Sequence, residues 1–282
     1  MKKYTLWIAL ILLADTLYVY GQDGLSPEQI TTIRLLKQEL NMHAIGYRKD
    51  FCSINDSQDI ERALSNLDPI LVGENVVFGK AWLNVLSRTQ LEIFRERADK
   101  IYNAQTDLIG STPKYGEKIF IDFVSKVGIL AHSHYESNII CFNRNRSGYN
   151  YTNWDEIGER LSSIDDTLAH EIGHTFSSNT KWWSKKATEA WAIFLADYAL
   201  EKLDNEFGKK FRNDNYNHAY NKFHGGGLRS IGPTDSEYEY LLLALVDNVG
   251  WDTIKKAFRS YNNPGYPPRQ TFFDRIEHFK ER

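Results

Sequence analysis

Cysteine is scarce in this chain, with 2 in 282 residues, and net charge is small, at −3. Neither Cys52 nor Cys141 has a metal-binding partner at ligand spacing, which excludes a cysteine zinc site. A chain with both signs of charge interspersed lacks the basic surface that binds nucleic acid, so we expect no nucleic-acid partner. The basic cluster at 209–212 is typical of a solvated face.

Long apolar runs are also lacking after the first 21 residues, which argues against a transmembrane segment in the mature chain. The N-terminus itself has the pattern of an export signal. Lys2 and Lys3 precede an apolar run at 6–14, and Asp15 interrupts that run. The small residue Gly21 stands at the expected cleavage site. We therefore predict a signal peptide at 1–21, cleaved near Gly21, and a secreted or periplasmic protein.

Export also bears on the two cysteines. An even number of cysteines in an exported chain permits one disulfide between Cys52 and Cys141. The alternative is a pair of buried thiols, and the spacing does not choose between them.

The most informative motif is His-Glu-Ile-Gly-His at 170–174. Residues four apart on an α-helix lie one turn apart on the same face, so His170 and His174 can bind one ion together. Glu171, beside the first histidine, can reach a water on that ion. This HExxH spacing predicts one Zn²⁺ held by the two imidazoles, with Glu171 as a general base.

The residues around the motif favour a helix. Ser162 and Ser163 each precede an aspartate by three residues, as in a capping box with Asp in place of Glu. Gly173 leaves one flank thin, so another element can approach. The alternative is a surface helix with two solvated histidines. A helical wheel places one apolar stripe opposite the histidines: Ile164, Leu168, Ile172 and Phe176.

A zinc site of this kind needs a third protein ligand and an open fourth position. The residues after His174 lack the glycine and third histidine of a metzincin. We predict that Glu189 is the third ligand, because it lies on an apolar seam of a helical segment at 187–203, where a lone carboxylate needs a partner or a metal. Two other acids are alternatives to Glu189. Glu201 lies near the helix end, which suits a solvated role, and Asp197 could orient a ligand histidine.

These residues carry a resemblance to a known family. The stretch 170–203, HEIGHTF followed by KWWSKKATEAWAIFLADYALEKL, resembles the gluzincin metallopeptidases, and within them the enhancin-like, mucin-degrading group (peptidase family M-sixty). The segment 245–261 resembles the helix-Gly-Trp-helix near the end of that catalytic domain. The resemblance covers roughly residues 90–265. It implies a zincin fold, one zinc ion and peptide-bond hydrolysis.

The coarse pattern predicts an α+β fold with a zincin-type catalytic domain. N-terminal helices and a mixed sheet precede a mostly helical C-terminal part that carries the HExxH active-site helix. We divide the chain into a signal peptide at 1–21, an N-terminal helical segment at 22–86 and a metallopeptidase domain at 87–282. Helices are expected at 26–41, 57–67, 87–104, 187–203, 236–248, 252–261 and 271–280, strands at 118–125, 129–134 and 138–143, and loops at 144–153, 205–221 and 224–234.

The predicted function is a secreted zinc-dependent endopeptidase that acts on extracellular proteins, with glycoproteins among the candidate substrates. Two alternatives stay open: a zincin-fold binding protein without turnover, and a zinc hydrolase of a non-peptide substrate. His132 and His134 alternate on a predicted strand and favour a surface role over substrate contact. The spacing does not choose among six candidates for the residue that stabilises the oxyanion: His218, His224, Tyr216, Tyr220, Tyr238 and Tyr240.

Overall fold

The structure is a computed structural model of the full chain. It describes residues 69–113, 118–124, 131–134, 138–143, 157–158, 160–176, 188–225, 235–261 and 272–280. The chain divides into two compact units, 1–46 and 47–282, and the described residues all belong to the second. The predicted signal peptide, the helices expected at 26–41 and 57–67 and the loop expected at 144–153 lie outside the described residues.

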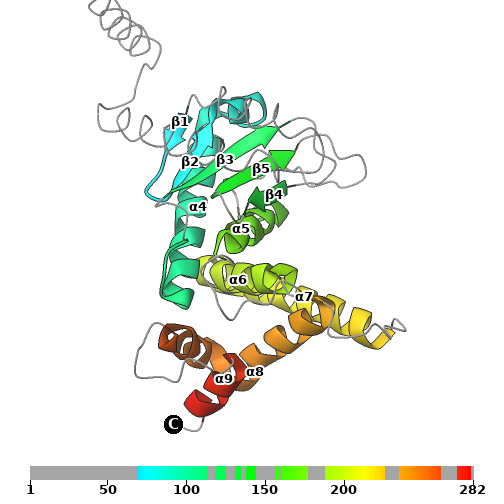
Figure 1. Ribbon diagram of the computed structural model, residues 1–282. Coiled ribbons are helices and arrows are strands. Elements are labelled where there is room, and N and C mark those ends of the chain that lie inside the picture. Colours follow the sequence, from blue (N-terminus) through cyan, green and yellow to red (C-terminus); the bar gives the residue numbers. More distant parts are fainter. Residues whose placement is uncertain are drawn as a thin grey trace, which may run out of the picture. The chain divides into compact units, whose positions relative to one another are not determined.

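This second unit is α+β, as the sequence predicts, with a mixed sheet and a larger helical part (Figure 1). The sheet has the order β1-β2-β3-β5-β4. Its central pairs, β2 with β3 and β3 with β5, are parallel, and its outer pairs are antiparallel. The strands are β1 (Pro69–Val72), β2 (Val76–Gly79), β3 (Ile119–Val124), β4 (Ala131–His134) and β5 (Ile139–Asn143).

The strands predicted from alternation correspond to β3, β4 and β5, but β1 and β2 were not predicted. Both precede residue 87, where we placed the start of the catalytic domain, and β2 pairs with β3. The sheet therefore contains strands from both sides of that boundary. A short 3₁₀ helix, η1 (Lys80–Asn84), follows β2 and buries Trp82, whose indole N–H donates to the Ile121 carbonyl at 3.0 Å.

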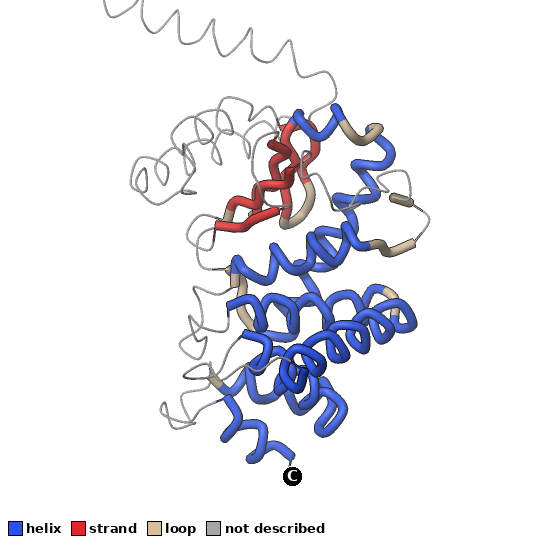
Figure 2. Tube along the Cα trace, turned by 90° about the vertical axis from the view of Figure 1, so that its right-hand side faces the viewer, coloured by secondary structure: helices blue, strands red, loops and turns tan. Residues whose placement is uncertain are grey.

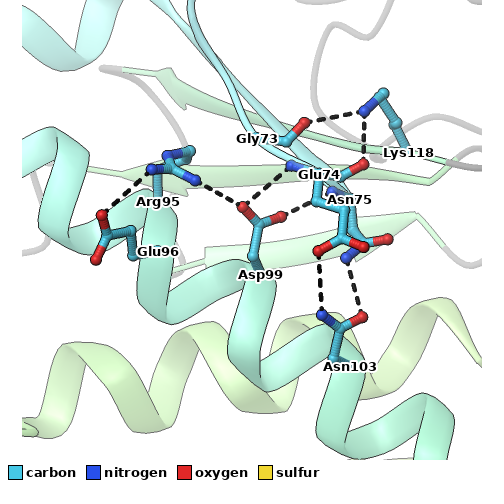
Figure 3. A network of polar contacts seen from close by, with 8 residues as sticks. All are labelled: Gly73, Glu74, Asn75, Arg95, Glu96, Asp99, Asn103 and Lys118. Carbon is cyan, nitrogen blue, oxygen red and sulfur yellow. Dashed lines mark hydrogen bonds and ion pairs between the residues drawn. The ribbon is translucent and has the colours of Figure 1, made fainter.

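A polar network ties the turn between β1 and β2 to the first long helix, α4 (Arg88–Ile109) (Figure 3). Asp99 of α4 accepts hydrogen bonds from the backbone N–H groups of Glu74 (3.2 Å) and Asn75 (2.7 Å). Lys118, just before β3, donates to the Gly73 carbonyl at 2.9 Å. A Cβ on Gly73 would lie 2.3 Å from the Asp99 carboxylate, so a larger residue would displace this side chain from its hydrogen bonds with the turn.

The helix α4 begins where the sequence predicts. Ser87 and Gln90 form a capping box, and Gly110 ends the helix in a left-handed conformation with φ of 81°, later than the predicted end at 104. One face of α4 packs on the sheet, where Phe94 meets Phe78 and Trp82 with ring centroids 5.6 and 5.5 Å apart.

The remaining helices follow as α5 (Ser163–Thr175), α6 (Thr188–Leu203), α7 (Asn205–Gly225), α8 (Asp235–Ser260) and α9 (Phe272–Lys280). Figures 1 and 2 show α5 beside the sheet, with α6 on its far side and α8 beyond. The contacts agree, since α5 packs on β4 and α6, and α6 also packs on α4, α7 and α8. This order makes α6 the centre of the helical part, and its residues from Phe194 to Leu200 are buried.

The helix α7 corrects the loop that we predicted at 205–221. Asparagine is a weak helix former, which made the segment look irregular. Packing outweighs this propensity, because α7 lies against α6 and α8 and presents Phe207 and Phe211 to the core. Asp204 caps the helix by accepting from the backbone N–H groups of Glu206 and Phe207 at 3.1 and 2.9 Å. The loop predicted at 224–234 lies outside the described residues from 226 onward.

The helices predicted at 236–248 and 252–261 form α8, whose helical geometry is interrupted only at Gly250, with φ of 74°. The sequence therefore placed the break between them correctly. None of the described helices is both long enough and apolar enough to cross a membrane.

Candidate metal centre

The helix α5 carries the HExxH residues, and its start is defined by one of the two serines proposed for it. Ser162 is the N-cap: its side chain accepts from the Ile164 N–H at 3.3 Å, and its own N–H donates to Asp165 at 2.7 Å. Ser163 is instead the first helical residue. The predicted apolar stripe is buried along its whole length, at Ile164, Leu168, Ile172 and Phe176.

Gly173 sets how closely α6 approaches α5. A Cβ on this glycine would lie 3.1 Å from both the Cα and the carbonyl oxygen of Ala192, which is tighter than ordinary van der Waals contact. The thin flank predicted at Gly173 is therefore occupied by the backbone of α6. This contact holds the first turn of α6, where Glu189 lies, next to the last turns of α5.

His170, His174 and Glu189 converge at this junction. The Nε2 atoms of the two histidines are 2.9 Å apart. The carboxylate of Glu189 lies 3.2 Å from His170 Nε2 through one oxygen and 3.5 Å from His174 Nε2 through the other. One ligand atom from each residue therefore lies within 4.8 Å of the other two.

This triangle fits a small tetrahedral ion. Two atoms that bind Zn²⁺ tetrahedrally at about 2.0–2.1 Å are themselves roughly 3.4 Å apart. The two nitrogens are 2.9 Å apart, and each lies close to that value from a different oxygen of Glu189, His170 at 3.2 Å and His174 at 3.5 Å. Two imidazole nitrogens and one carboxylate oxygen are also a donor set that zinc accepts, with a fourth position left for water. These residues could thus hold a metal ion.

The environment of Glu189 differs from the expected one. Its side chain is 60% exposed at the first turn of α6, and so it does not lie on a buried seam. Its nearest polar groups are the histidines: hydrogen bonds from His170 and His174 hold the pKa of its carboxyl far below the usual range, against the opposing effect of burial.

Neither rival of Glu189 joins this group. Glu201 accepts from Arg212 at 3.3 Å and from the Trp251 indole at 3.1 Å, and its side chain is only 13% exposed. The solvated role that we expected for Glu201 is therefore wrong. Asp197 is buried and accepts from Asn215 at 2.9 Å, so the hydrogen bond observed for it is not to a ligand histidine.

The carboxylate of Glu171 faces away from solvent beside the triangle. The residue is 6% exposed, and its Oε2 atom is buried with no hydrogen-bond partner in the structure. Burial raises the pKa of this carboxyl, while the neighbouring His170 and His174 act in the opposite direction. A buried carboxylate with one oxygen left unpaired, next to three convergent candidate ligand atoms, is suited to accept a proton.

A second acid, Asp166, influences His170 and was missed as a site residue. It lies one turn earlier on α5. Burial lowers the pKa of His170, but the hydrogen bond that His170 donates to Glu189 and the charges of Glu171, Glu189 and Asp166 outweigh it and raise that pKa. Burial in turn raises the pKa of Asp166 to about 6. The spacing of four residues from His170 is the signal that could have identified it.

The weaker candidates are placed as follows. His132 and His134 lie on β4, the edge strand that packs against α5, and their side chains are outside the described part. His218 is exposed on α7, while the side chains of His224 and Tyr238 are not described. The rings of Tyr216, Tyr220 and Tyr240 pack together between α7 and α8, with centroids 5.4–6.3 Å apart. No contact singles out one of them as an oxyanion donor.

Comparison with known proteins extends only to the fold. No family model matches the sequence, and no curated protein matches it. The chain is similar to the crystal structure of a functionally unknown conserved protein mutant from Bacillus anthracis str. Ames, with a TM-score of 0.51 and 11% sequence identity. The similarity covers 82% of this chain and 50% of that chain, so this chain spans half the length of the solved structure. At this identity the likeness shows a shared fold alone.

Proposed function

We propose that this protein is a zincin-type zinc endopeptidase that hydrolyses peptide bonds of extracellular proteins, glycoproteins among them. The observation that carries the proposal is the convergence of His170, His174 and Glu189 next to the buried carboxylate of Glu171, whose Oε2 atom has no hydrogen-bond partner. A pure binding module has no use for a base in this position. A zinc ion bound there supplies a Lewis acid that lowers the pKa of water toward neutrality and polarises a carbonyl.

Within this proposal, each residue has a separate task. His170, His174 and Glu189 hold the ion, and Gly173 keeps the helix of the third ligand close to that of the first two. Glu171 accepts a proton from the attacking water and later passes it to the leaving amine. Its raised pKa suits both steps, since a general base works best with a pKa near the working pH.

The sheet offers support for an extended peptide as substrate. The strand β4 is at the edge of the sheet and packs against α5. Its outer backbone groups are therefore free of a strand partner among the described residues, and an extended polypeptide could pair with them. Such pairing would lay the substrate backbone along the helix that carries Glu171.

The test compares wild type with Glu171→Gln, matched for zinc content, on a mixture of secreted proteins and mucin-type glycoproteins. Glu171 is not a metal ligand in this scheme, so the variant should keep its zinc and lose roughly a hundredfold to ten-thousandfold in rate. Cleavage sites mapped by mass spectrometry identify the substrate class. A zinc-loaded wild type that cleaves nothing across this panel, yet binds one of its members tightly, would replace the peptidase with the binding protein.

A further inference from the structure

A pocket of about 600 Å³ lies at the end of α5 opposite to the histidines. Its walls come from α4, from the residue before the N-cap of α5 and from the C-terminal end of α6, and these helices pack on each other (Figure 1). His174 lies eleven residues after the start of α5, which corresponds to roughly 16 Å along the helix. The pocket is therefore separate from the candidate metal centre.

The charged side chains of the pocket are mainly basic. Arg97, Lys100 and Lys202 contribute three positive charges, against one negative charge from Asp204. The carboxylate of Asp204 already accepts two backbone N–H groups at the start of α7. Among the described residues, neither lysine forms an ion pair, and Lys202 has only the face of the Tyr198 ring, 5.4 Å away.

Arg97 provides a fixed donor in the same wall. One of its terminal nitrogens, Nη1, donates to both oxygens of Asp165 at 3.2 and 3.4 Å, and Asp165 is fully buried. This anchors the guanidinium, while its Nε and Nη2 atoms have no partner among the described residues. The side chain is 13% exposed and lines the pocket.

We propose that this pocket binds a small molecule carrying a sulfate or phosphate group. A tetrahedral oxyanion accepts hydrogen bonds from several directions, which suits one anchored guanidinium and two ammonium groups that lack carboxylate partners. The volume leaves room for the body of a ligand beyond its charged group, next to Leu161 and Asn103. This site requires neither the metal nor Glu171, so it stands apart from the peptidase proposal.

The test measures binding of inorganic sulfate, inorganic phosphate, glucose 6-sulfate and glucose 6-phosphate by calorimetry, at constant ionic strength and in the presence of a chelator. The full chain is compared with Lys100→Gln/Lys202→Gln. The control is Lys209→Gln/Lys210→Gln, which removes the same charge from an exposed face of α7. Arg97 stays in place, because its loss would leave Asp165 buried without its cation.

We expect saturable binding of at least one probe by wild type and by the control, weakened about tenfold or more in the pocket variant. The preferred probe then distinguishes sulfate from phosphate and a sugar ester from the free ion. Three results would overturn the proposal: no saturable binding of any probe by wild type, equal affinity in the pocket variant, or an equal loss in the control, which would indicate a diffuse charge effect.

Discussion

Gly173 of α5 lies against the backbone of Ala192 of α6 with no room for a side chain between them. The two histidines come from one of these helices and Glu189 from the other, so this contact influences the distance between the histidines and Glu189.

The first prediction changes that distance. Gly173→Ala should weaken zinc binding about tenfold or more, because the new methyl group must push α6 away by a few tenths of an ångström. Alanine normally stabilises a helix interior by about 1 kcal/mol relative to glycine, and this gain should be absent here. Competition with a chromophoric chelator measures the first effect, and urea unfolding measures the second.

The control for this variant removes the side chain of Ala192, the residue that Gly173 contacts. The atoms that crowd Gly173 belong to the backbone of Ala192, so adding Ala192→Gly should not restore zinc binding. A Gly173→Ala protein that is more stable than wild type and binds zinc equally well would show that α6 approaches less closely than described.

The second prediction separates Glu189 from Glu201. Glu189→Gln should lose most of the zinc affinity with little change in stability, because its side chain is largely exposed. Glu201→Gln should keep its zinc but lose about 1–3 kcal/mol of stability, since Arg212 and Trp251 lose a charged acceptor. Elemental analysis and urea unfolding of both variants provide the comparison. The assignment fails if the two proteins behave alike, or if Glu201→Gln is the one that loses zinc.

The third prediction concerns pH and Asp197. Burial raises the pKa of this carboxyl well above its usual value, with the charge of Asp166 adding to the effect, while the hydrogen bond from Asn215 opposes it. An acid whose pKa is raised on folding stabilises the folded state most at low pH, below its unfolded pKa of about 3.9, and that contribution is lost as pH rises toward the folded value.

Asp197→Asn mimics the protonated form and can still accept from Asn215. Its stability relative to wild type should therefore increase from pH 4 toward neutrality, by at most about 1.4 kcal/mol per pH unit. Urea unfolding at a series of pH values, in a chelator so that metal binding does not contribute, checks this. Parallel stability profiles for the two proteins would mean that Asp197 titrates normally.

The fourth prediction concerns the cysteines. Cys141 lies half-buried on β5, and Cys52 is outside the described residues, so their pairing is still a prediction. If they pair, mass spectrometry of the unreduced exported protein should yield one linked peptide that separates on reduction. Labelling of both residues by a thiol reagent in the unfolded, unreduced protein would instead identify two thiols.

The sequence was most informative where a signal was local. The capping box before α5, its apolar stripe and the break at Gly250 each depend on residues a few positions apart, and each was predicted correctly. Long-range packing was harder to foresee. The Asn-rich sequence of α7 predicts a loop, because the packing on α6 and α8 that stabilises this helix is not visible in its own residues. Strands as short as β1 and β2 carry little periodicity, so the sequence does not reveal them.

The candidate ligands show the same limit. The sequence predicts Glu189 on an apolar seam, yet its side chain is exposed, and it meets the histidines where Gly173 lets α6 come close to α5. The partners of Glu201 cannot be deduced from spacing alone, since Arg212 and Trp251 come from other helices. The influence of Asp166 on His170 is different, because the two residues lie four apart on α5.

The size of the ligand triangle also limits which cations can use it. Calcium takes six to eight oxygen ligands at 2.3–2.6 Å, and magnesium keeps an octahedral shell made mostly of oxygen, so two imidazoles with Nε2 atoms 2.9 Å apart suit neither. Sites with nitrogen ligands generally bind zinc, copper and nickel more tightly than manganese or ferrous iron. Alkaline-earth ions should therefore compete poorly for these three donors, two of which are imidazole nitrogens.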